Sequence, residues 1–355
     1  MIYHYTFQYF PSLHPEYYTG VVGNGYLAVD MFFILSGFVM AHVYHGMFLQ
    51  DVGSNYLDFL KARVARLYPV HLLILGLFVA TSLAARAAEY AATGTFEMIP
   101  LEGARSLSAL FANLFMLQGL RASDLSWNYP AWSISVEFIA YLVFPLALPT
   151  IWRAGLVSKA AMTGAIVAAI GWLALLTKDN FNQWDGPLTL LRCLPEFLLG
   201  SLLYIAYRRG VGAQVLRHDA VAIGLIGLTF VLLHRRAADL AIVLLFAVLV
   251  LSLVGNRGVV AAVLNARPLV WLGEISYSLY LLHGLVQYVT TRVLFRDLTW
   301  PIGGKLAAST SFLLTAGMVT VTVGLATMTY RYVEVPGRRF VRQAWTTSPR
   351  RSDAK

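Results

Sequence analysis

Cysteine and charged residues are scarce in this chain. Cys193 is the only cysteine, which excludes an internal disulfide, and Cys and His nowhere cluster at the spacing of metal ligands. We therefore expect no bound metal. Charged residues make up only 13% of the 355 residues, whereas 58% are hydrophobic. Because a soluble core could not hide so much apolar surface, the composition predicts a polytopic membrane protein.

Acidic residues are outnumbered by basic ones, at 18 Asp and Glu against 27 Lys and Arg. Such an excess can indicate a nucleic-acid partner, but here the basic residues lie in short segments between apolar runs and in the C-terminal tail. We expect no nucleic acid, and membrane lipids as partners. Loops on the side of the tail hold 17 Lys and Arg, and loops on the opposite side hold 9. The tail side is therefore predicted to be cytoplasmic.

Nine apolar segments are close to the roughly 20 residues that a helix needs to cross a bilayer. We expect each of them to be a transmembrane helix, which makes the predicted fold class an all-α integral membrane protein with nine full spans. The segments are 24–45, 69–91, 132–152, 160–177, 188–207, 219–234, 239–254, 267–292 and 304–328.

Two further apolar segments are too short to cross. Residues 106–120 have polar flanks and are predicted to form a re-entrant or interfacial helix. Residues 1–10 have the aromatic and apolar character of a span but about half its length, so they are predicted to be the outer stub of a tenth helix. No basic region precedes this stub, which is unlike a signal peptide.

The chain contains neither an internal repeat nor a break in composition before its end. Residues 1–342 are therefore predicted to form a single membrane domain. Residues 343–355 are polar and basic and lack apolar periodicity, so we expect a disordered cytoplasmic tail.

Polar side chains within the spans gather at similar depths, and Asp30 is the most informative of them. A carboxylate inside a membrane span costs several kcal/mol, so it is expected to face a polar partner or a functional cavity. Counted along each helix, the polar residues lie roughly 6 to 14 Å below the outer surface. We expect one buried polar centre in the outer half of the membrane. The residues of this layer are His4, Asp30, Glu137, Arg192, Glu196 and His283.

A basic motif precedes the second span, in the sequence FLKARVARLYP. Arg63 and Arg66 are three positions apart and lie on one face of a helix. Paired guanidinium groups bind phosphate oxygens well, so this face is a plausible anchor for a nucleotide-bearing donor. The alternative is that the motif contacts lipid headgroups and serves only to orient the protein.

Several long stretches resemble the membrane acyltransferase-3 family, which includes bacterial O-antigen and exopolysaccharide O-acetylases. They occur in the order of the family and extend from one end of the chain to the other. They are YHYT at 3–6, GYLAVDMFFILSGFVM at 25–40, RVARLYP at 63–69, AWSISVEFIAYLVFP at 131–145, LPEFLLGSLLY at 194–204, LGEISYSLYLLH at 272–283 and YRYVEVPGRR at 330–339.

The resemblance implies catalytic roles for His4, Asp30 and Glu137, and donor binding by Arg63 and Arg66. It also implies contacts to the substrates, which we assign to Trp132, Ser133, Arg192 and His283. Family members place an arginine eleven positions before the histidine, which falls ahead of Met1 here. Together with the short stub, this departure leads us to expect that the native chain begins upstream.

The implied reaction is the transfer of an acyl group, most simply acetyl, from cytoplasmic acyl-CoA to a hydroxyl of an extracytoplasmic or lipid-linked glycan. A sugar hydroxyl needs a base to attack a thioester, and a histidine is suited to accept its proton. His4 is the candidate base, and either Asp30 or Glu137 would orient its imidazole. A covalent acyl-histidine relay remains an alternative. The implied location is the bacterial inner membrane.

A transporter or flippase of a lipid-linked saccharide is the second functional class, because it would also place charges within the bundle. Transporters commonly carry corresponding Gly- or Pro-broken spans in two halves, and no such correspondence occurs here. The residues Trp127, Tyr129, Pro130 and Trp132 could stack on sugars or form an interfacial aromatic belt. The sequence identifies neither the acyl group, the glycan nor the oligomeric state.

Overall fold

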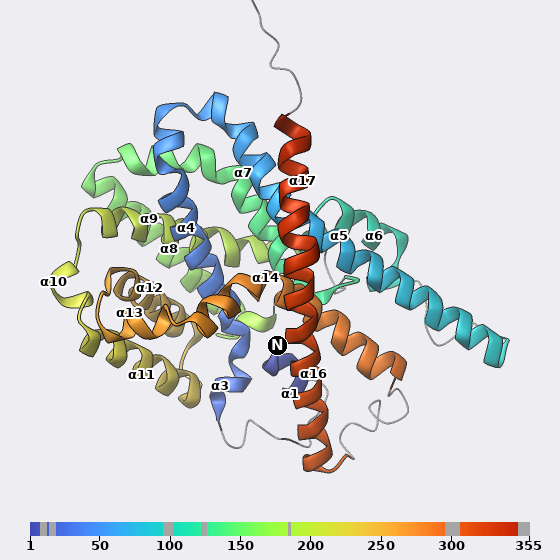
Figure 1. The fold of residues 1–355 in the computed structure, drawn as a ribbon. Helices are drawn as coiled ribbons and strands as arrows, with labels where there is room; N and C mark the ends of the chain where they lie inside the picture. Colours follow the sequence, from blue (N-terminus) through green and yellow to red (C-terminus); the bar gives the residue numbers. More distant parts are fainter. Residues whose placement is uncertain are drawn as a thin grey trace, which may run out of the picture.

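The computed structural model describes residues 1–7, 13, 19–94, 102–121, 126–183, 186–294 and 306–346. Within these ranges the chain is helical and contains no β-strand, and its long helices pack into a bundle (Figure 1). This agrees with the predicted all-α membrane architecture. The expected disordered tail, residues 343–355, falls largely outside the described residues.

Among the residues that the structure describes, seven helical segments are long and apolar enough to cross a membrane. Their apolar residues are distributed around most of the helix surface, as is usual where one side packs against protein and the other faces lipid. Several of these segments include a short 3-10 or π-helical turn at one end of the α-helix. The α-helices themselves are α4 (Ala28–Gln50), α5 (Val52–Thr93), α7 (Trp132–Arg153), α8 (Leu156–Leu176), α9 (Thr189–Arg208), α14 (Arg267–Tyr288) and α16 (Ala308–Thr329).

The other two predicted spans are shorter. They correspond to α11 (Asp219–Arg235) and α12 (Asp239–Gly255), which have 17 residues each. Such a helix is about 26 Å long, less than the roughly 30 Å thickness of a hydrocarbon core. The predicted count of nine full spans is therefore not reproduced within the described residues.

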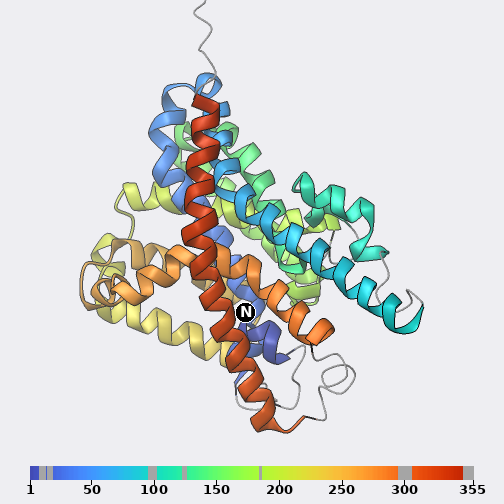
Figure 2. The ribbon, with the colours of Figure 1, turned by 45° about the vertical axis from the view of Figure 1, so that its right-hand side comes forward.

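Helix α5 is longer than the predicted second span because it also contains the predicted loop before it. Its 42 residues extend for about 63 Å, so its Thr93 end projects beyond the other helices (Figure 2). Only Asp51 separates α4 from α5. The Asp51 carboxylate accepts hydrogen bonds from the backbone N–H groups of Gly53, at 2.9 Å, and Ser54, at 3.4 Å, which starts α5 as an N-cap. Arg63 and Arg66 are consequently held on a rigid helix.

The end of the chain is also a continuous helix. Helix α16 passes through a π-helical turn (Tyr330–Glu334) into α17 (Val335–Thr346). The end of α17 lies at the same end of the molecule as the turn between α4 and α5 (Figures 1 and 2). Helix α17 includes residues 343–346 of the predicted tail, and residues 347–355 lie outside the described ranges.

The segments predicted to be too short to cross are indeed short helices. Helix α6 (Leu107–Leu114) has eight residues, or about 12 Å of helix. It lies within the segment expected to be re-entrant or interfacial. The predicted N-terminal stub contains α1 (Ile2–Phe7), and its residues 8–10 lie outside the described ranges. The remaining short α-helices are α3 (Gly20–Gly23), α10 (Ala213–Leu216) and α13 (Val259–Leu264).

Two glycines allow α4 and α9 to approach each other closely. A methyl group on Gly37 would overlap the carbonyl oxygen of Phe197, and one on Gly200 would overlap the carbonyl oxygen of Ile34. Small residues at a crossing let membrane helices pack backbone against backbone, which strengthens their association. This contact fixes the relative positions of two helices that carry candidate site residues.

Candidate active site

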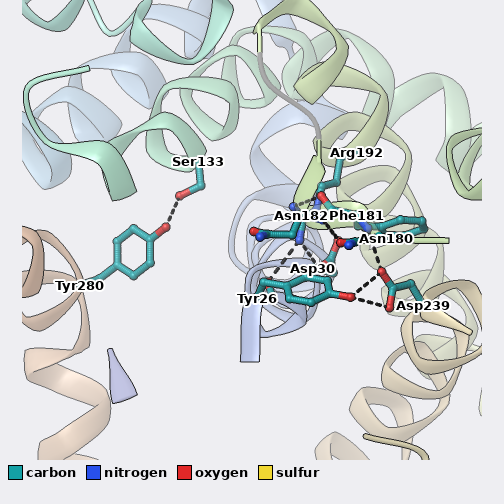
Figure 3. Close-up of polar contacts among 9 residues, drawn as sticks. All are labelled: Tyr26, Asp30, Ser133, Asn180, Phe181, Asn182, Arg192, Asp239 and Tyr280. Carbon is teal, nitrogen blue, oxygen red and sulfur yellow. Dashed lines mark hydrogen bonds and ion pairs between the residues drawn. The ribbon is translucent and has the colours of Figure 1, made fainter. Parts of the chain in front are cut away.

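Asp30 of α4 and Arg192 of α9 form a buried ion pair (Figure 3). The Nε and Nη2 atoms of Arg192 donate hydrogen bonds to Oδ1 and Oδ2 of Asp30 at 2.7 and 2.6 Å. Their exposed fractions are 0% for Asp30 and 3% for Arg192. Arg192 also donates to the backbone carbonyls of Tyr26, at 3.1 Å, and Phe181, at 2.7 Å. The bidentate geometry satisfies the buried carboxylate on both oxygens.

A second carboxylate supports the loop around this pair. Asp239 accepts hydrogen bonds from the hydroxyl of Tyr26 at 2.9 Å and from the backbone N–H of Phe181 at 2.8 Å (Figure 3). Both partners also contact Arg192 through their carbonyls. The sequence places Asp239 at the start of an apolar segment, where an acid normally faces water, so its burial was not predicted.

His4 and His283 stack on each other at a distance of 5.2 Å between ring centroids. The ring of Tyr129 meets both edge-on, at 4.8 Å from His4 and 5.8 Å from His283. Nδ1 of His283 lies 2.6 Å from the carbonyl oxygen of Tyr280. Because a carbonyl oxygen only accepts, Nδ1 must carry the hydrogen, and the lone pair of this imidazole then resides on Nε2.

A cavity of about 360 Å³ lies among four helices. It contains four residues that the sequence singled out: Arg63, Arg66, Ser133 and Glu137. Neither His4, Asp30 nor Arg192 is among the described residues that line it. Its walls are formed by Val29, Phe32, Phe33, Leu35, Ser36, Val39 and Met40 of α4, Arg63, Arg66 and Leu67 of α5, Ser133, Ile134, Glu137 and Tyr141 of α7, and Ser276, Tyr277 and Tyr280 of α14.

Glu137 is held in this cavity by two hydroxyl groups. Its Oε1 accepts hydrogen bonds from Ser36 at 2.5 Å and from Tyr141 at 2.6 Å. Ser36 is six residues beyond Asp30 on α4, so Glu137 lies about 9 Å further along that helix than Asp30. The carboxylate therefore belongs to the same cavity as the two arginines.

The groups in direct contact with Arg63 are neutral. Its guanidinium donates to the hydroxyl of Tyr44 at 2.5 Å and contacts the sulfur of Met40 at 3.4 Å. It also lies over the rings of Tyr44, Phe59 and Tyr141 at 5.1 to 5.8 Å. Among the described residues no carboxylate forms an ion pair with it. Cation–π contacts hold the charge without neutralising it.

Arg66, in contrast, forms an ion pair with Glu334. Glu334 lies in the π-helical turn after α16, is 1% exposed, and also accepts hydrogen bonds from Arg338 at 2.9 Å and from Ser278 at 2.7 Å. The Arg66 guanidinium lies over the ring of Tyr277 at 5.2 Å. Glu334 was missed from the sequence, although it falls within the stretch YRYVEVPGRR.

The residues of the predicted polar centre therefore occupy three neighbouring places rather than one cavity. These are the Asp30–Arg192 pair, the histidine pair and the cavity around Glu137. Glu196, which is 0% exposed, lies beside Asp30 and belongs to the first of them. The depth count assumed that α4 and α7 begin at the same level. The hydrogen bond from Ser36 to Glu137 shows that α7 begins further along α4, and the residues before α7 are buried, with Asn128 2% and Ala131 0% exposed.

Two aromatic residues connect the three places. Trp132 lies 6.2 Å from the ring of Phe33, a cavity residue, and 5.5 Å from the Arg192 guanidinium. Tyr280 lines the cavity, its hydroxyl lies 2.7 Å from Oγ of Ser133, and its ring is 5.5 Å from that of His283. Trp132, Ser133 and Tyr280 thus lie between the cavity and the two buried pairs.

Comparison with known families is consistent with this arrangement. A family model described as an acyltransferase domain matches residues 1–331. The chain belongs to the acyltransferase-3 family. It is therefore an acyltransferase that transfers groups other than aminoacyl groups, and its seven apolar helices make it a multi-pass membrane protein.

Three relatives with curated names illustrate its similarities. The chain is 26% identical to acyltransferase MdmB of Streptomyces mycarofaciens over 92% of this chain and 84% of MdmB. It is 28% identical to the exopolysaccharide production protein ExoZ of Rhizobium meliloti over 73% of this chain and 75% of ExoZ. It is 22% identical to O-acetyltransferase OatA of Staphylococcus aureus over 93% of this chain but only 55% of OatA. No solved structure matches the chain.

Proposed function

We propose that this acyltransferase moves an acyl group from acyl-CoA to a hydroxyl of a glycan. The observation that supports this most strongly is the cavity in which Arg63 and Arg66 lie beside Glu137. A cavity that combines paired guanidinium groups with apolar walls suits a ligand that carries phosphate at one end and an acyl thioester at the other.

The charges around the cavity favour an anionic ligand. Arg66 shares the carboxylate of Glu334 with Arg338, whereas the groups in contact with Arg63 are neutral. A buried or half-buried guanidinium is stabilised when an anion binds, because the ion pair replaces lost hydration. A phosphate of the donor that binds Arg63 would supply the missing charge, and Arg66 would add a second set of N–H donors.

In the proposed reaction, the oxygen of the acceptor hydroxyl attacks the carbonyl carbon of the thioester. The hydroxyl proton passes to the imidazole of His4, and the carbon–sulfur bond breaks to release the CoA thiolate. The proton then returns from His4 to this thiolate, so that the products are an ester and free CoA. Histidine is suited to this exchange because its ordinary pKa is near neutrality.

The remaining site residues receive different proposed roles. Glu137 is the carboxylate of the donor cavity, and its two hydroxyl partners fix its orientation. Asp30 acts through Arg192, which its carboxylate holds in place. Trp132, Ser133 and His283 would contact the substrates, since they lie between the cavity and His4 or directly against His4.

The acceptor is proposed from the names of relatives. ExoZ is named for exopolysaccharide production and OatA as an O-acetyltransferase, which favours an extracytoplasmic or lipid-linked glycan that receives acetyl groups. With a cytoplasmic tail and a location in the bacterial inner membrane, the donor would bind near the end of the molecule where α17 ends. The thioester end of the donor would extend between the helices toward the acceptor on the opposite side.

The test is the transfer of labelled acetyl groups from acetyl-CoA to surface polysaccharide, in cells with and without the protein. We expect label only in cells with the protein, and we expect the Arg63→Ala/Arg66→Ala variant to bind CoA at least about tenfold more weakly. The matched control is Arg208→Ala/Arg209→Ala, which removes two arginines outside the cavity and should bind CoA normally. Unlabelled polysaccharide together with impaired saccharide export would favour the transporter alternative.

A further inference from the structure

The cavity around Glu137 opens along one side of α4. Two of its lining residues, Phe32 and Val39, are 53% and 38% exposed. Both are apolar and lie within a helix that is long and apolar enough to cross the membrane. Exposed apolar side chains on such a helix face lipid. The mouth of the cavity therefore faces the hydrocarbon of the bilayer rather than water.

The opposite side of the mouth is formed by α14, through Ser276, Tyr277 and Tyr280. The deeper surface is formed by α5 and α7, which carry the arginines and Glu137. Helices α4 and α14 are thus the two sides of an opening, and α5 and α7 are its floor. A molecule in the cavity can extend a hydrocarbon chain between α4 and α14 into the membrane. On the α14 side the hydroxyl groups of Tyr277 and Tyr280 already donate hydrogen bonds, to the carbonyls of Leu67 and Pro130.

Polarity changes along the length of the cavity. Its lining on α4 runs from Val29 to Met40, which is about 16 Å of helix. Arg63 contacts Met40 at one end of this stretch, while the other end is lined by Val29, Phe32 and Phe33. A ligand that fits this gradient has an anionic group at the arginines and a hydrocarbon group near Val29, Phe32 and Phe33, where Phe32 also borders the opening.

We propose that the donor site accepts acyl-CoA with chains longer than acetyl, and that the distal part of the chain leaves the cavity between α4 and α14 and lies in the bilayer. This inference rests on the proposed function, because it takes Arg63 and Arg66 as the phosphate site. A site specific for acetyl would need a closed wall that blocks longer acyl chains. Among the residues that the structure describes, none forms such a wall on the side of Phe32 and Val39.

The acyl chain of the donor is a better occupant of the opening than a lipid-linked saccharide. At about 360 Å³ the cavity is at the small end of ligand pockets, so it has room for a thioester arm but little more. The residues of the mouth on α4 are apolar and offer a saccharide no hydrogen bonds. The arginines at the inner end, in contrast, complement the phosphates of CoA.

The experiment measures equilibrium binding of CoA, acetyl-CoA, butyryl-CoA and octanoyl-CoA to the full-length protein in lipid nanodiscs. If the chain reaches the bilayer, affinity should increase with chain length, and octanoyl-CoA should bind at least about tenfold more tightly than acetyl-CoA. The Arg63→Ala/Arg66→Ala variant lacks the proposed phosphate site, so octanoyl-CoA that still associates with its nanodiscs measures partition into the lipid. This amount is subtracted from the binding to the wild type. The transfer of labelled octanoyl and acetyl groups is measured in parallel.

Two matched tryptophan variants locate the opening. Val39→Trp should reduce the ratio of octanoyl-CoA to acetyl-CoA affinity to below about threefold by closing the mouth. Val43→Trp provides the control, because Val43 is 57% exposed one turn further along α4 and does not line the cavity. Its ratio should equal that of the wild type.

Affinity that is flat or falls with chain length would overturn the inference, and so would an equal loss in both tryptophan variants. If acetyl-CoA still binds and reacts in that case, the proposed function survives and only the lateral opening for the acyl chain is rejected. If no acyl-CoA binds in a manner that depends on Arg63 and Arg66, the proposed function is rejected and the inference falls with it.

Discussion

The carboxylate of Asp30 and the guanidinium of Arg192 are joined by two parallel hydrogen bonds, although 162 residues separate them in the chain. Removal of one partner of a buried ion pair typically costs about 3–5 kcal/mol. Asp30→Asn should destabilise the protein by up to about this amount, because the buried carboxyls of Glu196 and Asp239 near Arg192 offset part of the loss. Thermal or denaturant unfolding in a mild detergent measures the loss.

The double variant Asp30→Asn/Arg192→Met separates stability from catalysis. It removes both charges, so it should be more stable than Asp30→Asn alone. If Asp30 also contributes to transfer, activity should remain low in the double variant even where stability recovers. Recovery of both together would mean that the ion pair has only a structural role.

The contact of Gly37 with the backbone of α9 supplies a second prediction. Gly37→Ala should destabilise the protein by about 1–3 kcal/mol, because the added methyl group would overlap the carbonyl oxygen of Phe197. Gly46→Ala is the matched control on the same helix, where an added methyl group meets no atom within 4 Å. That change should be neutral or slightly stabilising. A similar loss in both variants would contradict close packing as the cause.

The sequence predicted the helical membrane fold because long apolar segments have few other stable conformations in lipid. It also grouped Asp30 with Arg192 correctly, since each needs a partner inside the membrane. It placed Arg63 and Arg66 on one face of a helix but did not predict that this helix is continuous with the second span. The cap at Asp51 begins that helix in a segment whose charges resemble those of a loop.

The positions of side chains that are set by tertiary contacts could not be predicted from the sequence. Glu137 was assigned to the depth of Asp30, because a count along a helix assumes that the helix begins at the membrane surface. Here α7 begins after a buried segment, and Glu137 contacts Ser36 rather than the level of Asp30 on α4. Glu334 was overlooked because an acid beside several arginines after the last span looks solvent-exposed. Its burial follows from the packing of α17 against α5.

Glu334 provides a third prediction, because it is the carboxylate that holds Arg66. Glu334→Gln should lower stability by about 1–3 kcal/mol, less than for a fully enclosed pair, since the side chains of Arg66 and Arg338 are each 30% exposed. Unfolding measurements test this. Glu274→Gln is the control, because Glu274 is exposed on α14 and its replacement should have little effect. Equal stability of Glu334→Gln and the wild type would show that the buried network contributes nothing.

Asp51 makes a fourth prediction that concerns pH. Hydrogen bonds from Ser54 and from the backbone N–H of Gly53 hold the pKa of the Asp51 carboxyl below its ordinary value. A lowered pKa in the folded state stabilises the protein above the unfolded pKa, near 4, and this stabilisation is lost as the pH falls through the folded pKa.

Asp51→Asn keeps an effective cap but cannot ionise. The melting temperature of the wild type minus that of Asp51→Asn should therefore fall as the pH decreases below about 4. Asp51→Ala should be less stable than both at neutral pH, because it loses the cap. A difference between wild type and Asp51→Asn that is constant from pH 7 to pH 3 would contradict the role of the ionised carboxylate.

The last prediction distinguishes proton transfer at His4 from its packing. His4→Phe retains an aromatic ring against His283 and Tyr129 but cannot accept a proton. If His4 is the base, transfer should fall by about 10²- to 10⁴-fold. CoA affinity should remain within about twofold, because the residues proposed to bind the donor phosphates lie in a cavity that His4 does not line. Substantial transfer by a stable His4→Phe variant would remove the base role from His4, and His283, whose Nε2 carries a lone pair, would then be the next histidine to replace.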